Sequence, residues 1–151
     1  MNDAIVEIGI AVVLRKRRVL VGIRSADGPL PNKHEFPGGK CWPGESSSDC
    51  AVRECLEETG LTVEASRLLQ STTHMYAHAT VRLHFWECTV AVHSAPAPNS
   101  PFDWIPLSHL AALNWPAANA PSVQLLVDRD SQSVEKQPAL QSPENGHDGV
   151  G

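Results

Sequence analysis

Two runs rich in Ile and Val, residues 5–14 and 19–23, constrain the fold of this chain more than any other feature. β-Branched residues favour strands, and only the basic tetrad 15–18 separates the two runs. This spacing predicts a β-hairpin with a basic turn. A basic tetrad can also bind nucleic acid, but a short solvated turn between two strands is the commoner explanation.

One capped helix is predicted after a long loop. Residues 24–43 are rich in Pro and Gly, which break helices, and long ordered loops in compact domains are often functional. Residues 46–49 then offer capping side chains, and Gly60 stands where a left-handed residue ends a helix. Two pairs spaced i, i+4 define the apolar side of this helix: Val52 with Leu56, and Ala51 with Cys55.

The remaining elements complete a mixed α/β, or α+β, sandwich. Residues 68–73 and 81–92 are typical of strands, and residues 104–107 of a short strand. Residues 121–127 are typical of a terminal helix with Pro in its first turn. From residue 129 onward large apolar residues are scarce, so we expect residues 1–128 to form the domain and residues 129–151 a disordered tail.

Length and charge exclude several classes of protein. A chain of 151 residues makes about one domain. Its net charge of −5, from 17 carboxylates against 12 Lys and Arg, argues against bulk attraction to duplex DNA or to an anionic membrane. The apolar runs are too short for a membrane span and residues 1–4 lack the basic start of a signal peptide, so we expect neither membrane insertion nor secretion. The four cysteines stand singly, so we expect reduced thiols and a cytoplasmic protein.

Three carboxylates share one face of the predicted helix. Glu54, Glu57 and Glu58 stand at i, i+3 and i+4, within reach of one point, where they repel one another unless a cation lies between them. A hard divalent ion such as Mg²⁺ or Mn²⁺ suits these ligands. A solvated acidic helix surface is the alternative. The preceding pair Gly38-Gly39 favours the metal site, because paired glycines let the backbone approach a ligand and leave a carbonyl free.

The spacing of these residues resembles the signature of the Nudix hydrolases. A glycine, five residues, Glu, seven residues, then Arg-Glu and Glu-Glu-x-Gly run from Gly39 to Leu61, with Cys55 where an aliphatic residue is usual. The segment 23–40, the Trp104-x-x-Leu107-x-x-Leu110 element and residues 115–121 are similar to the MutT branch of that family. The resemblance implies a mixed β-sheet sandwiched between α-helices and covers roughly residues 5–128.

The resemblance also implies roles for individual residues. The metal ligands would be the Gly38 carbonyl with Glu54, Glu57 and Glu58, while Arg53 would orient the adjacent carboxylate and Glu45 would support the loop or the metal shell. Asn119 would read the base, since an amide offers both donor and acceptor; the alternative is a cap for the last helix. The other expected substrate-binding residues are Arg24, Phe36, Lys40 and Tyr76, and Tyr76 is equally well explained as a core aromatic.

One departure from the family pattern concerns water activation. Many MutT relatives carry an additional Glu before the Trp104 element, whereas residues 89–102 contain no Asp or Glu. Water activation is therefore assigned to Glu54 or Glu57. The resemblance implies a monomeric, Mg²⁺-dependent hydrolase of 8-oxo-dGTP that releases the monophosphate and pyrophosphate. The alternatives are another substrate, such as a cytidine or pterin triphosphate or a nucleoside diphosphate sugar, or a Nudix-fold binding module without activity.

Overall fold

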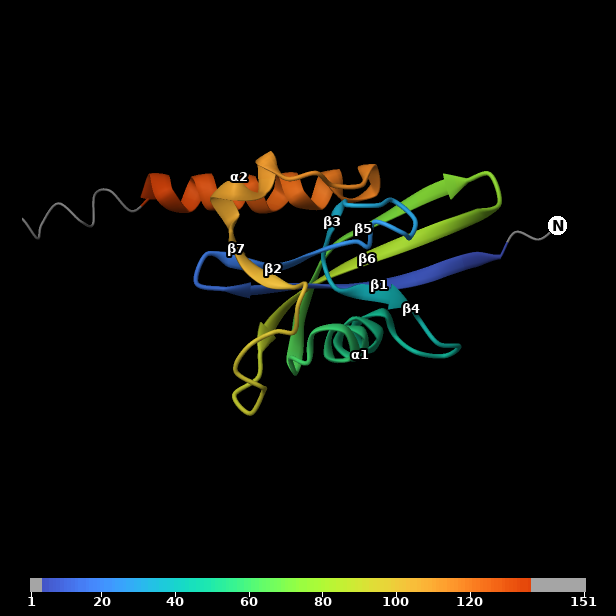
Figure 1. Ribbon diagram of the computed structural model, residues 1–151, viewed down its shortest axis with the longest axis horizontal. Coiled ribbons are helices and arrows are strands. Elements are labelled where there is room, and N and C mark those ends of the chain that lie inside the picture. The colour runs from blue at the N-terminus through green and yellow to red at the C-terminus, as the bar shows by residue number, and fades with distance from the viewer. Residues whose placement is uncertain (1–3, 137–151) are drawn as a thin grey trace, which may run out of the picture.

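A seven-stranded mixed sheet with one long helix on each face forms the centre of the molecule (Figure 1). The computed structural model describes residues 4–136. The strands follow the order β3-β2-β1-β6-β5, while β4 pairs with β1 and β7 with β2. The elements are β1 Ile5–Arg15, β2 Arg18–Ile23, β3 His34–Glu35, β4 Gly38–Lys40, α1 Ser47–Thr59, β5 Val63–Tyr76, β6 Ala79–Val90, β7 Asp103–Pro106, the 3₁₀ helices η1 Leu107–Ala112 and η2 Ala117–Asn119, and α2 Ala120–Lys136.

The alternation of side chains along β1 divides the core into two layers. Ile10 and Val12 pack towards α2, in one cluster with Phe85 of β6. Ala11 and Val13 point the other way and pack against α1. Strands β1 and β6 are parallel, from Ile5 opposite Thr80 onward, whereas the other strand pairs are antiparallel. The expected α+β architecture, a mixed sheet between helices, is therefore confirmed.

The predicted N-terminal hairpin is also confirmed, with a tighter turn than the tetrad suggested. Arg15 and Arg18 pair with each other, and only Lys16 and Arg17 turn the chain, with φ of 49° and 65°. Positive φ at both turn positions matches the right-handed twist of the flanking strands. Arg17 also donates two hydrogen bonds to Asp130 of α2, at 2.9 and 3.1 Å, so the turn is tied to the rest of the domain.

Local capping sets the ends of α1 as predicted. Ser46 Oγ accepts a hydrogen bond from the Asp49 N–H at 3.1 Å, and Gly60 adopts φ 80°, at which its N–H donates to the Leu56 carbonyl. The helix approaches β1 very closely, since a Cβ at Gly9 would lie 2.6 Å from the Ser47 carbonyl oxygen. Of the two predicted apolar pairs on α1, Ala51 and Cys55 are buried, together with Cys50 and Thr59, whereas Val52 is only partly buried and Leu56 is 49% exposed.

Several elements extend beyond their predicted bounds. The expected loop 24–43 contains the short strands β3 and β4, and β5 runs from Val63 to Tyr76 instead of 68–73. Helix α2 continues to Lys136, so the expected start of a disordered tail at residue 129 is wrong. Polar contacts account for the continuation, because Arg129 pairs with Glu87 at 3.3 Å and Asp130 with Arg17. The rest of that tail, residues 137–151, lies outside the described residues. Within residues 4–136, no helix is long and apolar enough to cross a membrane.

The packing of α2 on the sheet is testable by one substitution. Leu126 is fully buried against the sheet, so Leu126→Ala is expected to lower the free energy of unfolding by about 2–5 kcal/mol through lost burial and the cavity left behind. Urea unfolding followed by circular dichroism measures this change. The exposed Gln124→Ala on the same helix should stay within about 0.5 kcal/mol of the parent. Equal stability of both variants would mean that α2 does not pack on the sheet.

Candidate active site

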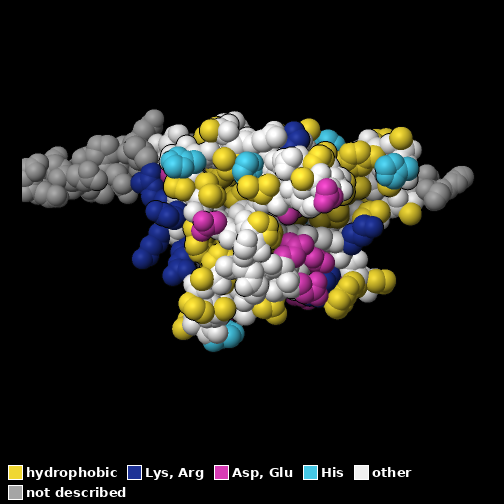
Figure 2. Space-filling view, viewed as in Figure 1, with side chains coloured by type: hydrophobic (Ala, Val, Ile, Leu, Met, Phe, Trp, Pro, Cys, Tyr) yellow, Lys and Arg dark blue, Asp and Glu magenta, His cyan; other side chains and the backbone are white. Residues whose placement is uncertain are grey.

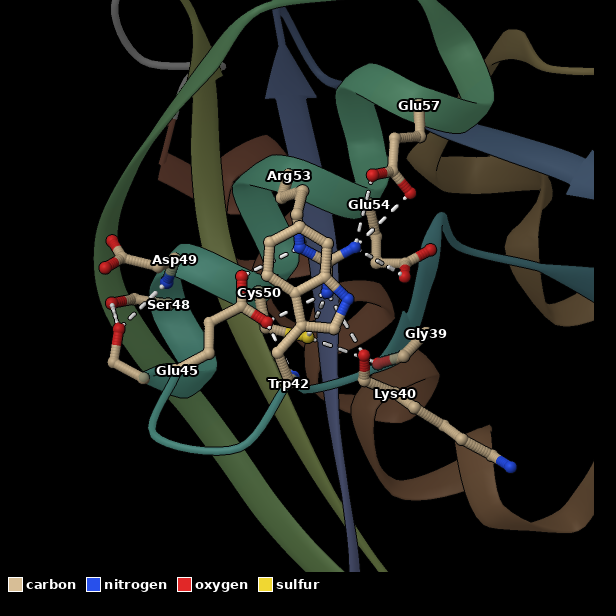
Figure 3. A network of polar contacts seen from close by, with 11 residues as sticks. Gly39, Lys40, Trp42, Glu45, Ser48, Asp49, Cys50, Arg53, Glu54 and Glu57 are labelled. Carbon is tan, nitrogen blue, oxygen red and sulfur yellow. Dashed lines mark hydrogen bonds and ion pairs between the residues drawn. The ribbon is translucent and has the colours of Figure 1, made fainter.

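Arg53 is the hub of the polar network on α1 (Figure 3). Its guanidinium donates to both Glu45 oxygens at 2.8 Å, from Nε and from Nη2. Nη1 donates to Glu54 Oε2 at 3.0 Å and to Glu57 at 3.3 Å, and Nη2 donates to the Lys40 carbonyl at 3.1 Å. The Arg53 guanidinium therefore connects three carboxylates to the backbone of β4. The predicted association of Arg53 with the adjacent carboxylate is present in the structure.

Glu45 anchors the loop that precedes α1. Besides the two bonds from Arg53, its Oε1 accepts the Trp42 N–H at 2.9 Å. The Arg53 guanidinium holds the pKa of Glu45 at about 2, well below its usual range, so this carboxyl stays ionised. The indole ring of Trp42 covers the guanidinium, with Arg53 Cζ 3.8 Å from the ring centroid. Sequence reasoning did not identify Trp42, because a lone exposed Trp carries no spacing signal.

Glu54 and Glu58 lie against the paired glycines. A Cβ at Gly39 would lie 2.6 Å from Glu54 Oε2, so a larger residue there would displace this carboxylate. Glu58 Oε1 accepts the Gly38 N–H at 3.2 Å. The third helix carboxylate, Glu57, is half exposed and bonded to Arg53. The backbone of β4 thus approaches the acidic face of α1 as the paired glycines predict.

The electrostatics of this cluster suit a divalent cation. Burial raises the pKa of Glu58 to about 7, the Gly38 N–H opposes this shift, and the charges of Glu54 and Glu35 add to it. A cation held between these carboxylates would relieve the repulsion, and carboxylate and carbonyl oxygens are the ligands that Mg²⁺ prefers. Among the described residues, no three acidic, His or Cys side chains lie close enough together to form a metal-ligand set, and Glu57 is bonded to Arg53.

A cavity of about 280 Å³ adjoins the carboxylate cluster. Figure 2 shows acidic side chains gathered near the middle of this face and basic ones at its left edge, where the β1–β2 turn lies in Figure 1. The cavity brings together five residues of the predicted site. They are Arg24, Phe36, Gly38, Lys40 and Asn119. Its apolar walls come from Ile8 and Ile10 of β1, Leu83 of β6, and Pro116.

Asn119 lies at the end of η2, directly before α2. The residue is only 8% exposed, and among residues 4–136 its side-chain amide has no hydrogen-bond partner, while its backbone N–H donates to the Pro116 carbonyl. A nearly buried amide that borders a cavity without a protein partner is free to bond with a ligand. The alternative of a helix cap is not supported by any side-chain hydrogen bond from Asn119 to α2.

Arg24 and Glu35 form an ion pair in the cavity wall. Arg24 Nη1 donates to Glu35 Oε1 at 3.1 Å, and Arg24 Nε donates to the Pro29 carbonyl at 3.0 Å. Burial raises the pKa of Glu35, and the Arg24 charge opposes this shift. Sequence reasoning missed Glu35. Its place on β3 directly before Phe36 and the paired glycines is the signal that could have identified it.

Tyr76 is not brought to this cavity. It pairs with Ala79 at the tip of the β5–β6 hairpin, whereas the cavity is lined by Leu83, whose partner on β5 is Thr72. Four residues of strand place Tyr76 about 13 Å farther along the sheet. There it is 49% exposed and stacks on His74, with ring centroids 5.7 Å apart.

Comparisons with known proteins agree with this geometry. The NUDIX domain family profile matches residues 9–125. The chain is 31% identical over 127 residues to 8-oxo-dGTP diphosphatase of Escherichia coli K12, covering 75% of this chain and 98% of that protein. It is 30% identical over 81 residues to CTP pyrophosphohydrolase of the same organism, covering 54% and 60%. A solved MutT structure from methicillin-resistant Staphylococcus aureus superposes with a TM-score of 0.69 at 26% identity, over 85% of this chain and 99% of that one.

Proposed function

The chain belongs to the NUDIX domain family of hydrolases, and from that premise we propose that its substrate is 8-oxo-dGTP, which it converts to the monophosphate and pyrophosphate. The observation that carries this proposal is the nearly buried, unpaired amide of Asn119 in a cavity beside the carboxylate cluster. An amide can donate to one group of an oxidised purine and accept from its neighbour. A base that left this amide unpaired would be rejected.

The side chains around the cavity would have different roles in the reaction. Glu54, Glu57 and Glu58, with the Gly38 carbonyl, would hold Mg²⁺, which when bound lowers the pKa of the attacking water and neutralises charge on the phosphates. Arg53 fixes Glu54 through Oε2, which leaves Oε1 to accept the proton of the water. Glu45 in turn fixes Arg53. Lys40 and Arg24, at the cavity wall, supply positive charge to the triphosphate.

The carboxylate cluster explains how an acidic protein holds an anionic substrate. The chain carries a net charge of −5, so its overall field does not attract a triphosphate. Glu54, Glu57 and Glu58 would hold divalent metal, which would offset their negative charge at the place where the phosphates bind. Binding would therefore depend on the metal, and chelation of divalent ions with EDTA is expected to abolish nucleotide binding as well as turnover.

Pyrophosphate release with Mg²⁺ across 8-oxo-dGTP, dGTP, dCTP, CTP and ADP-ribose tests the proposal. We expect the highest kcat/KM with 8-oxo-dGTP. Asn119→Ala should lower that value by about 10- to 100-fold and dCTP turnover by less, because the lost hydrogen bonds belong to the purine. The exposed Asn99→Ala serves as the control. Highest activity with CTP, as the similarity to CTP pyrophosphohydrolase allows, would contradict the proposal.

A further inference from the structure

One oxygen of Glu35 remains available in the cavity wall. Its Oε1 accepts the bond from Arg24 Nη1, and among the described residues no hydrogen bond reaches Oε2. The side chains of Arg24 and Glu35 are only 31% and 28% exposed. A carboxylate oxygen with this degree of burial accepts hydrogen bonds and offers none, so it favours a ligand that presents N–H groups.

Arg24 fixes the direction of this acceptor. The guanidinium is held at two points, by Glu35 and by the Pro29 carbonyl, so neither side chain of the pair is free to turn without breaking a charged hydrogen bond. Burial raises the pKa of the Glu35 carboxyl, and the charge and hydrogen bond of Arg24 oppose this shift. The wall therefore carries a preorganised acceptor instead of a mobile surface carboxylate.

Glu35 and Asn119 border the same small cavity, whose other walls combine the apolar side chains of Ile8, Ile10 and Leu83 with the basic residues Arg24 and Lys40. The two residues therefore line one space of about 280 Å³, where a single bicyclic base would meet both of them. The Asn119 amide can donate a hydrogen bond to the exocyclic oxygen of such a base, and the Glu35 carboxylate can accept hydrogen bonds from two neighbouring N–H groups. Guanine and its oxidised forms have this order of groups: an exocyclic oxygen, a ring N–H and an exocyclic amino group.

We propose that Glu35 is a specificity-determining residue that accepts hydrogen bonds from the ring N–H and the 2-amino group of a guanine-type base. This inference rests on the proposed function and deepens it. Adenine has a ring acceptor in place of the N–H, so its lone pair would face the carboxylate and be repelled. Hypoxanthine keeps the ring N–H and lacks only the 2-amino group, which makes it the sharpest probe.

The first measurement compares dGMP with dIMP by isothermal titration calorimetry, in the presence of Mg²⁺ and without turnover. Since a hydrogen bond to a charged group is the difference between them, the parent protein is expected to bind dGMP about 10- to 100-fold more tightly. In Glu35→Gln the ratio should fall below about threefold. Glu35→Asp, which keeps an anionic acceptor, should restore part of the ratio, and Glu64→Gln on the exposed side of β5 should leave it unchanged.

Kinetic ratios provide the second measurement. The kcat/KM ratio of dGTP to dITP should fall in Glu35→Gln by the same factor as the binding ratio. Equal binding of dGMP and dIMP to the parent protein would overturn the proposal, and so would a Glu35→Gln protein that keeps the parental ratio. If Glu35→Gln does not fold, the parental ratio and Glu35→Asp still decide the question.

Two further outcomes distinguish base recognition by Glu35 from a role at the metal centre and from failure of the proposed function. The charge of Glu35 reaches Glu58, so a role at the metal centre would make Glu35→Gln weaken Mn²⁺ affinity, with base ratios unchanged, and that result would overturn base reading. If the protein releases no pyrophosphate from any purine triphosphate, the proposed function fails. The ratio of dGMP to dIMP binding would still test Glu35 by itself.

Discussion

Glu54→Gln is expected to lower kcat/KM for pyrophosphate release by about 10³-fold. The substitution keeps the volume of the side chain and removes the charge that lies over Gly39 and binds Arg53. The substitution would remove both metal binding and proton acceptance by Oε1. Because these two functions act together in one step, their loss lowers the rate as a single large effect. Initial rates of pyrophosphate release at saturating Mg²⁺ measure the loss.

The control for this prediction is Glu64→Gln, which removes the same charge from an exposed position of β5 and should retain parental rates. Thermal unfolding of Glu54→Gln should stay close to that of the parent, since the loss is in chemistry and not in folding. Glu57→Gln is expected to be similarly impaired, because Glu57 would be one of the metal ligands. Normal turnover in both Glu54→Gln and Glu57→Gln would refute the assignment of the site.

Gly39→Ala is expected to lower kcat/KM by about 10²-fold through displacement of the catalytic carboxylate. The added Cβ would collide with Glu54, and a shift of about 1 Å at a reacting group is enough for such a loss. Gly28→Ala is the matched control, since a Cβ there would meet only the Ser25 side chain at 4.0 Å. Parental activity in Gly39→Ala would show that Glu54 can move away from β4 without consequence.

The parts of the fold that local chemistry determines could be predicted from the sequence. The hairpin needed only two β-branched runs and a short polar interval, and α1 needed only Ser46 and Gly60 at its ends. The strands β3 and β4 could not be predicted, because strands of two and three residues owe their existence to pairing with β2 and β1. For the same reason α2 could not be followed to its end, where ion pairs with distant residues continue it.

In the candidate site, too, contacts between residues close in sequence could be predicted, whereas those that depend on strand pairing could not. The family resemblance implied that Arg53 would orient Glu54, and the structure contains that contact, whereas the pairing of Arg53 with Glu45 emerged only from the structure. Glu35 was missed and Tyr76 was included because their relation to Asn119 depends on strand register, which the sequence does not display. Shifts along a strand move a side chain by several ångströms per residue.

The parallel pairing of β1 with β6 has a consequence for biosynthesis. Strand β1, at the centre of the sheet, is made before its partner β6, since Ile5 pairs with Thr80, which leaves the ribosome later. Contacts between segments so distant in sequence form slowly, because a long stretch of chain must be ordered before they are gained. Until β6 is synthesised, the nascent β1–β2 hairpin exposes the apolar side chains of both its faces. Exposed apolar strands aggregate readily, so this hairpin is a site of aggregation risk during translation.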